Sequence, residues 1–255
     1  MSCPLDPNIK FTKNMTDFVS EDGNDMTRIP YREAIGKLMY LMIGSRPDIA
    51  YAVSTLSQFM ASPHPLHWNA VKRLIRYVKG TAGHGILFSC QENSNILTGY
   101  SDSDWAGCCD TRLSTSGSVF KINGGPVSWS SKKQRSISRS SCEAELKAAS
   151  DASAEIIWLR RLLKGIGLKQ ELPTTLWMDN MSAIRLIKNP EQHQRTKHVE
   201  VQYFFIREHV NLKRIEVKHI KTQEQLADPF TKSLSPVLFQ RLRMDLNIIN
   251  WSENK

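Results

Sequence analysis

The stretch that decides the fold is Thr98-Gly99-Tyr100-Ser101-Asp102-Ser103-Asp104-Trp105-Ala106-Gly107. Ile96 and Leu97 precede it and small residues end it, a pattern typical of a buried strand that terminates at a turn. A carboxylate at the end of a central strand is costly to bury unless a positive group lies against it. The chain has no Lys or Arg within five residues of Asp102 on either side, so we expect a metal ion there. The alternative, from this stretch alone, is a pair of solvated acids on a loop.

Composition and charge indicate a globular protein with a polyanionic partner. The chain has 255 residues, 40% of them hydrophobic, which suits one large domain or two small ones. A net charge of +9 favours nucleic acid or an acidic membrane surface as a partner. The longest apolar run, residues 38–43, is far shorter than the ~20 residues of a membrane span. The N-terminus does not resemble a secretory signal, so we expect an intracellular protein without membrane association.

The five cysteines form an odd set without a C-x-x-C pair. This pattern argues against a disulfide framework and against a cysteine-based zinc site. His193 and His198 lack a suitably spaced cysteine pair, so we favour substrate contact or loop structure over zinc for them. We expect the cysteines to be reduced.

The first third of the chain has helical periodicity. Residues 1 to about 30 are polar and without a sustained period, and residues 31–60 then predict a helical hairpin interrupted at Arg46-Pro47-Asp48. A third helix is predicted over 67–79. Its outer face is basic, with Lys72, Arg73, Arg76 and Lys79.

The rest of the chain predicts a mixed sheet. Strands are expected at 85–89, 96–102, 118–122 and 127–131, the last three antiparallel, with Asn123-Gly124-Gly125 as a hairpin turn. Ser140 and Glu143 fit a capping box that opens a long helix to Leu163. The elements expected after it are, in order, strand 174–178, helix 181–187, helix 199–210, strand 214–220 and a helical turn 225–231. This order predicts an α/β fold with helices on both faces.

Four acids fall near the ends of these elements. Strand ends and helix starts gather at one edge of an open α/β sheet, so Asp102, Glu145, Asp179 and Asp228 are candidates for one cluster. Carboxylate oxygens suit Mg²⁺ or Mn²⁺. Two such ions can activate water and stabilise a leaving oxygen in phosphodiester hydrolysis.

Several motifs together resemble the ribonuclease H domain of copia-type LTR-retrotransposon polyproteins. They are Tyr100-Ser101-Asp102-Ser103-Asp104-Trp105-Ala106-Gly107, Ser128-Trp129-Ser130-Ser131-Lys132-Lys133-Gln134, Ser140-Ser141-Cys142-Glu143-Ala144-Glu145, Asp179-Asn180-Met181-Ser182-Ala183, Arg195-Thr196-Lys197-His198-Val199 and Gln225-Leu226-Ala227-Asp228-Pro229-Phe230-Thr231-Lys232. The earlier stretches Ala34 to Tyr40, Arg46 to Ala50 and His67 to Thr81 resemble the tail of the reverse transcriptase that precedes this domain. A Tyr-x-Asp-Asp-like polymerase motif is missing from the sequence.

The resemblance implies a ribonuclease H-like fold of five mixed strands preceded by a small helical region. The implied domains are a reverse-transcriptase tail over 1–90, a ribonuclease H-like domain over 91–235 and a helical tail over 236–255. The family's four metal-binding, catalytic acids fall on Asp102, Glu145, Asp179 and Asp228, with two Mg²⁺ or Mn²⁺ ions. Asp102 is preferred to Asp104 as the leading member of its pair, and Glu145 to Glu143 because Glu143 serves the cap.

Some residues of the chain depart from the family pattern or have no settled role. Leu146 replaces a usual aromatic, which bears on packing, and Met181 replaces a usual Gln, which bears on substrate contact. His219 is the nearest candidate for the mobile histidine of many ribonuclease H enzymes. Trp129 and Trp158 are expected in the core. The nucleic-acid contacts that we expect are Lys72, Arg73, Arg76, Lys79, Asn180, Arg195, Lys197 and His198.

The resemblance predicts a metal-dependent endonuclease that cuts the RNA strand of an RNA–DNA hybrid. It would act with other parts of the polyprotein, in a cytoplasmic retrotransposon particle or in the nucleus. One alternative is an inactive or domesticated remnant that binds nucleic acid without cutting it. Another is an integrase-like or transposase-like nuclease, which would share the fold but not these flanking motifs.

Overall fold

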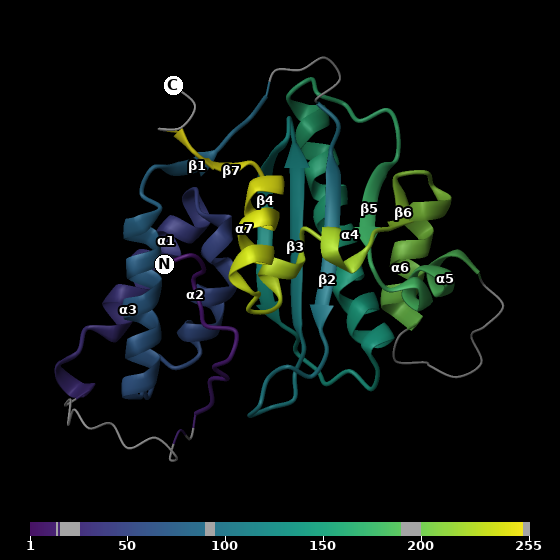
Figure 1. Ribbon diagram of the computed structural model, residues 1–255. Helices are drawn as coiled ribbons and strands as arrows, with labels where there is room; N and C mark the ends of the chain where they lie inside the picture. Colours follow the sequence, from purple (N-terminus) through teal and green to yellow (C-terminus); the bar gives the residue numbers. More distant parts are fainter. Residues whose placement is uncertain (14, 16–25, 90–94, 190–199, 252–255) are drawn as a thin grey trace.

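A five-stranded mixed sheet forms the centre of the protein (Figure 1). The structure is a computed structural model that describes residues 1–13, 15, 26–89, 95–189 and 200–251. The spatial order is β4-β3-β2-β5-β6, with β2, β3 and β4 antiparallel and β2, β5 and β6 parallel. The bounds are β2 Thr98–Asp104, β3 Thr115–Ile122, β4 Gly125–Lys133, β5 Thr174–Met178 and β6 Ile215–His219. The predicted α/β class is confirmed.

The hairpin between β3 and β4 turns where the sequence predicts it. Asn123 and Gly124 have φ angles of 53° and 79°, and two successive residues with positive φ are typical of the tight turns that match strand twist. The turn and a register shift between Phe120 and Lys121 together place Gly117 opposite Ser131. A Cβ at Gly117 would lie 2.6 Å from Thr231 Cγ2, so the glycine allows the last part of the chain to pack on the sheet.

Three helices pack on one face of the sheet: α4 Ser141–Gly165, α5 Met181–Lys188 and α6 Glu200–Asn211. Phe120 on this face and its neighbour Val119 belong to different core clusters, because side chains alternate along a strand. Ser140 caps α4 through its hydroxyl, which accepts from Glu143 N–H at 3.1 Å. Glu143 accepts from the backbone N–H of Arg139 instead of that of Ser140, so only half of the predicted capping box is formed.

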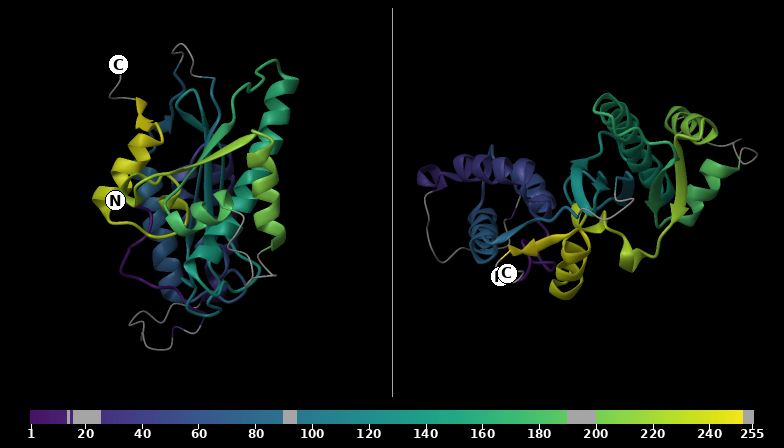
Figure 2. Two further views of the ribbon diagram at one scale, coloured as in Figure 1. Left: turned by 90° about the vertical axis from the view of Figure 1, so that its right-hand side faces the viewer. Right: turned by 90° about the horizontal axis from the view of Figure 1, so that it is seen from above.

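The other face is covered by helices from both ends of the chain. They are α1 Tyr31–Gly44, α2 Ala50–Ser57, α3 Pro65–Gly80 and α7 Pro236–Asp245, with short 3₁₀ turns η1 Met26–Arg28, η2 Pro47–Ile49, η4 Thr222–Glu224 and η5 Asp228–Phe230. Tyr77 of α3 and Phe239 of α7 are packed in one core with their rings 5.9 Å apart. A buried ion pair, Arg46 to Asp48 at 2.8 Å, lies within this core region. Figure 2 shows these helices on the opposite side of the sheet from α4.

The C-terminal segment returns to the N-terminal helices. After α7 it forms β7 Ile248–Asn250, which pairs antiparallel with β1 His84–Ile86 as a separate two-stranded sheet. The predicted strand near residue 85 therefore exists but lies outside the main sheet. In the expected C-terminal helical tail, α7 covers Pro236–Asp245.

Three expectations about single residues have clear outcomes. Trp158 is 54% exposed, so its predicted place in the core is wrong. Trp129 is half-buried against the N-terminal helices and donates its indole N–H to the carbonyl of Met42 at 3.0 Å. Leu146 is buried in the core beneath α4, so leucine fills the position where the family usually has an aromatic residue.

In the described part of the chain, no helix combines the length and the apolar character that a membrane crossing requires. Cys3, Cys108, Cys109 and Cys142 are free thiols, as the sequence predicts for these four.

Candidate metal centre

Three carboxylates from three elements meet at one edge of the sheet. Asp102 lies near the C-terminal end of β2, Asp179 directly follows β5, and Glu145 lies in the second turn of α4. β2 and β5 are adjacent and parallel, so their C-terminal ends lie together. One oxygen atom from each side chain lies within 4.8 Å of the other two. Asp102 and Glu145 are buried and Asp179 is half-buried.

Neighbouring groups orient two of these carboxylates. The backbone N–H and the hydroxyl of Ser103 both donate to Glu145 Oε1, at 3.0 and 3.1 Å. The hydroxyl of Thr222 donates to Asp179 Oδ2 at 2.9 Å. Glu145 Oε2 is buried and has no hydrogen-bond partner among the described residues. A buried carboxylate oxygen without a donor requires another source of positive charge.

The charge of the cluster acts against its own ionisation. Burial raises the pKa of Glu145 well above its usual value, and the charges of Asp102 and Asp179 raise it further. Burial and the charge of Asp102 likewise raise the pKa of Asp179, against the hydrogen bond from Thr222. A divalent cation would relieve this repulsion, and hard oxygen donors are the ligands that Mg²⁺ and Mn²⁺ prefer. Asp102, Glu145 and Asp179 therefore fit a divalent cation.

The fourth predicted acid lies beside this group and has a cation of its own. Asp228, at the start of η5, is buried, and its Oδ1 is 2.9 Å from Lys232 Nζ. Lys232 Nζ is also 3.9 Å from Asp102 Oδ2, and the Thr231 hydroxyl donates to that same oxygen. Burial and the charge of Asp102 raise the pKa of Asp228 to about 7, although Lys232 opposes this shift. Asp228 is not one of the three acids whose oxygens lie within 4.8 Å.

Asp104 and Glu143, the two acids that the sequence analysis did not choose as metal ligands, have different surroundings. Asp104 is half-buried, and burial raises its pKa, with Asp102 adding to the effect against the charge of Lys232. Glu143 forms an ion pair with Lys147 at 2.9 Å. Burial alone would raise the pKa of Glu143, but the hydrogen bonds from Lys147 and from the Arg139 backbone lower it. Glu143 is thus engaged at the start of α4, away from the group of three.

The basic residues predicted for nucleic-acid contact lie elsewhere. Lys72, Arg76 and Lys79 are exposed on α3, which lies among the N-terminal helices and not at the acid cluster (Figure 1). Arg73 is half-buried and forms an ion pair with Asp6 at 3.4 Å. The structure therefore does not bring this stripe and the three acids together.

The other predicted contact residues divide into two groups. Asn180 caps α5 by accepting from the N–H of Ala183 at 3.0 Å, and the exposed Met181 follows it. His219 ends β6 opposite Met178, the residue before Asp179, so its backbone lies next to the site. Arg195, Lys197 and His198, with His193, lie outside the described residues.

Sequence reasoning missed the residues that support the acids. Lys232 could have been found, because it stands four residues after Asp228 in a helical turn, the spacing of neighbouring side chains on a helix. Ser103 acts partly through its backbone, and Thr222 reaches Asp179 from a distant part of the chain. Neither contact has a local sequence signal.

The comparisons with known proteins found sequence relatives and solved structures of similar fold. No protein-family model matches it. It is 42% identical over 232 residues to the retrovirus-related Pol polyprotein from transposon TNT 1-94 of Nicotiana tabacum, covering 91% of this chain and 17% of that protein. It is 43% identical over 227 residues to the corresponding polyprotein from transposon RE2 of Arabidopsis thaliana, covering 88% and 16%. A solved structure of LC11-RNase H1, isolated from compost, is 16% identical with a TM-score of 0.42, covering 54% of this chain and 93% of that one.

The five-stranded mixed sheet, with acids at the ends of its two central parallel strands, places the chain in the ribonuclease H-like class. Within that class, the chain belongs to the family of retrovirus-related Pol polyproteins from copia-type transposons. It spans about a sixth of the length of the polyproteins described above.

Proposed function

We propose that this protein is a metal-dependent endonuclease that hydrolyses the RNA strand of RNA–DNA hybrids during retrotransposon reverse transcription. The observation that supports this function best is the group of Asp102, Glu145 and Asp179 oxygens within 4.8 Å of one another. Glu145 Oε2, buried and without a hydrogen-bond donor among the described residues, is the atom that most needs a cation. Asp228 would be an outer member of the same site.

The cofactor that we propose is a pair of Mg²⁺ or Mn²⁺ ions. When bound, such ions would lower the pKa of an attacking water molecule and stabilise the leaving oxygen. The chain's own residues hold the ligands in place: Ser103 orients Glu145, Thr222 orients Asp179, and the Thr231 hydroxyl donates to Asp102. Lys232 adds a positive charge at the side of the site where Asp228 lies.

Family membership supports the proposals for the substrate and the setting. We infer that residues 1–90 are the tail of a reverse transcriptase, 91–235 the nuclease domain and 236–255 a C-terminal tail. We also infer that the other parts of the polyprotein are partners, in a cytoplasmic retrotransposon particle or in the nucleus. A protein that reads an A-like helix through its broad minor groove can contact 2′-hydroxyls, so hybrid should be cut in preference to duplex DNA.

The test is cleavage of a labelled RNA–DNA hybrid by the purified chain. Mg²⁺ or Mn²⁺ should support cleavage and EDTA or Ca²⁺ should not, because the larger Ca²⁺ ion takes a looser coordination. Asp102→Asn, Glu145→Gln and Asp179→Asn should each abolish cleavage with unchanged circular dichroism. Asp228→Asn should reduce the rate less.

Glu143→Gln is the matched control, because it removes a carboxylate two residues from Glu145 on α4 that does not belong to the cluster. It should retain activity. Equal rates in EDTA, or normal turnover in any of the three cluster variants, would refute the proposal. Binding of hybrid without cleavage in either metal would favour the remnant function instead, and comparable cleavage of duplex DNA would favour an integrase-like nuclease.

A further inference from the structure

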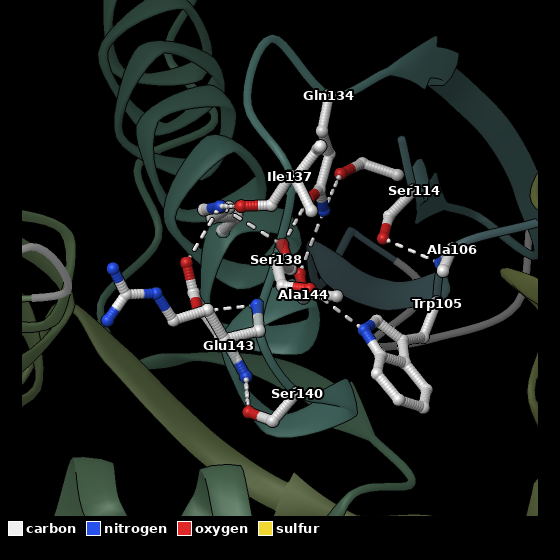
Figure 3. Close-up of polar contacts among 12 residues, drawn as sticks. Trp105, Ala106, Ser114, Gln134, Ile137, Ser138, Ser140, Glu143 and Ala144 are labelled. Carbon is white, nitrogen blue, oxygen red and sulfur yellow. Dashed lines mark hydrogen bonds and ion pairs between the residues drawn. The ribbon is translucent and has the colours of Figure 1, made fainter. Parts of the chain in front are cut away.

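Trp105 is an exposed aromatic residue next to the acid cluster. It directly follows β2, three residues after Asp102, and 51% of it is exposed. Its indole N–H donates to the carbonyl of Ser138 at 3.0 Å. Figure 3 shows that the nitrogen side of the indole faces the loop of Ser138, whereas the six-membered ring points away from the polar network. The exposed part of the side chain is therefore apolar.

The support under Trp105 is fixed by buried hydrogen bonds. Gln134, 8% exposed, donates through Nε2 to Ser116 Oγ and to the carbonyl of Ala144, each at 2.9 Å. Its Oε1 accepts from the Ser138 hydroxyl at 2.9 Å. On the other side, Ala106 has a φ angle of 55° and donates its N–H to Ser114 Oγ at 3.1 Å (Figure 3). The indole is thus held at its nitrogen by Ser138, and the backbone that follows it is held by Ser114.

The same network reaches the metal centre. Ala144, which accepts from Gln134, immediately precedes Glu145, and Trp105 follows the strand that bears Asp102. The position of the ring is therefore tied to two of the three clustered acids. Ile137, on the same loop as Ser138, is 59% exposed, and Lys147 Nζ donates to its carbonyl at 3.2 Å.

An exposed apolar ring on a fixed support contributes little to the stability of the free protein. Its rotational freedom is reduced by the bond to Ser138, and its apolar surface stays in water, so its burial can contribute only when a ligand covers it. In the proposed function the neighbouring acids bind a phosphodiester backbone, and the apolar features next to that backbone are the faces of the sugars that line the minor groove.

We propose that Trp105 is a positioning residue whose ring packs against the sugars of the RNA–DNA hybrid in its shallow minor groove and holds one phosphodiester over the acids. The inference rests on the proposed function. Because the indole N–H is already bonded to Ser138, the contact is one of shape and apolar area and is independent of base sequence. Removing about 100 Å² of aromatic surface from water would favour binding by roughly thirtyfold to 250-fold at full value, and the cost of ordering the complex reduces this toward tenfold.

The test compares Trp105→Ala with a matched tryptophan variant, Trp158→Ala. Trp158 is equally exposed, at 54%, but lies thirteen residues beyond Glu145 on α4, about 20 Å along the helix. Binding of a labelled hybrid is measured by anisotropy in Ca²⁺, and KM and kcat are measured in Mg²⁺. Trp105→Ala should weaken binding and raise KM about tenfold, with kcat within about threefold. Trp158→Ala should match the wild type.

Two further measurements separate positioning from a folding defect. Trp105→Phe keeps a ring but loses the bond to Ser138, and it should recover most of the affinity that Trp105→Ala loses. Hybrid should quench tryptophan emission in the wild type and in Trp158→Ala, and the quenching should disappear in Trp105→Phe. If the Trp105 and Trp158 variants have equal affinity, KM and quenching and the wild type still cleaves hybrid, the inference is overturned and the proposed function is not. A wild type that binds hybrid but cuts nothing would overturn only the proposed function, and a wild type that binds no hybrid would overturn both.

Discussion

The replacement Glu145→Gln should stabilise the metal-free protein. The two side chains have the same shape, and the amide oxygen of the introduced glutamine can accept the same two hydrogen bonds from Ser103 that Glu145 accepts. What the substitution removes is a negative charge that lies within 4.8 Å of carboxylate oxygens of Asp102 and Asp179. The expected change is therefore electrostatic, and its sign is opposite to that of most substitutions at buried positions.

The magnitude follows from Coulomb's law and from proton uptake. Two full charges 4.8 Å apart repel by roughly 3 to 4 kcal/mol at an effective dielectric constant of about 20. The wild type avoids part of this cost because Glu145, whose pKa is raised, takes up a proton. We therefore expect a gain of about 2 kcal/mol at pH 8, which corresponds to roughly 4 to 8 °C in Tm for a chain of this size.

The gain depends on pH in a defined direction. The folded-state pKa of Glu145 lies above the usual value of 4.5, so its contribution to stability is complete below that pH and is lost as pH rises through the folded-state pKa. Glu145→Gln has no carboxyl group to ionise at this position, so its stability does not fall in this way as pH rises. Thermal unfolding followed by circular dichroism in EDTA should give nearly equal Tm values at pH 4.5 and a higher Tm for Glu145→Gln at pH 8.

The control for this experiment is Glu143→Gln, which should change Tm in the opposite direction. Glu143 has an ion pair with Lys147 and accepts from the N–H of Arg139, and removing these interactions costs about 0.5 to 1 kcal/mol. Adding Mg²⁺ should raise the Tm of the wild type and of this control, but not that of Glu145→Gln. A Tm of Glu145→Gln at or below the wild type at pH 8 in EDTA, or the same gain at pH 4.5, would refute the reasoning.

Two other substitutions test the roles of basic side chains. Lys232→Met removes the ammonium group that lies 2.9 Å from Asp228 and 3.9 Å from Asp102. Since the Lys232 side chain is 39% exposed, the free energy of unfolding of the metal-free protein should fall by only about 1 kcal/mol. Calorimetry should show tighter Mg²⁺ binding, and an unchanged Mg²⁺ affinity would contradict this role. A quadruple alanine variant of the α3 stripe should flatten the plot of log affinity against log salt by about 0.7 to 0.9 for each phosphate that is no longer neutralised, with the rate at saturating hybrid nearly unchanged; an unchanged slope would make α3 a packed support. The residues replaced are Lys72, Arg73, Arg76 and Lys79.

Strands and turns could be predicted because their signals are local. β5 has the predicted bounds, Thr174–Met178, since a short apolar run before Asp179 is bounded by turn residues. The β3–β4 hairpin followed from Asn123-Gly124, whose φ angles are both positive. The meeting of Asp102 with Asp179 was predictable in outline, because both lie at the C-terminal ends of strands that finish at one edge of an α/β sheet.

The side on which a helical residue lies was predictable but was misjudged for Trp158. The buried residues of α4 that face the sheet recur at Ala149, Ala152, Ile156 and Leu159, a spacing of three and four residues. Trp158 is two residues, or about 200°, from Ile156 around the helix axis. The prediction for Trp158 relied on the apolar character of the side chain and not on its angular position around the helix axis.

The pairing of distant segments could not be read from the chain. β1 and β7 are three residues each and separated by more than half of the sequence, so their pairing has no periodic signal. The spacing from Asp228 indicated a partner for that acid in Lys232, but nothing in the sequence indicated that Lys232 also lies 3.9 Å from Asp102, whose local stretch has no basic residue. A positive group did accompany the buried acid, as electrostatics requires, but it came from the other end of the fold.

The position of Lys232 bears on how many ions the site accepts. Four carboxylates and one ammonium group give a formal charge of minus three when all are ionised, and the raised pKa values of Glu145, Asp179 and Asp228 show that the protein resists this state. One divalent ion would leave the formal charge at minus one, which repels a phosphodiester. Two would make it plus one, which attracts it. Because Lys232 already neutralises the Asp228 side, the uncompensated charge lies among Asp102, Glu145 and Asp179, where Glu145 Oε2 has no donor among the described residues. The charge balance thus supports the proposal of two ions.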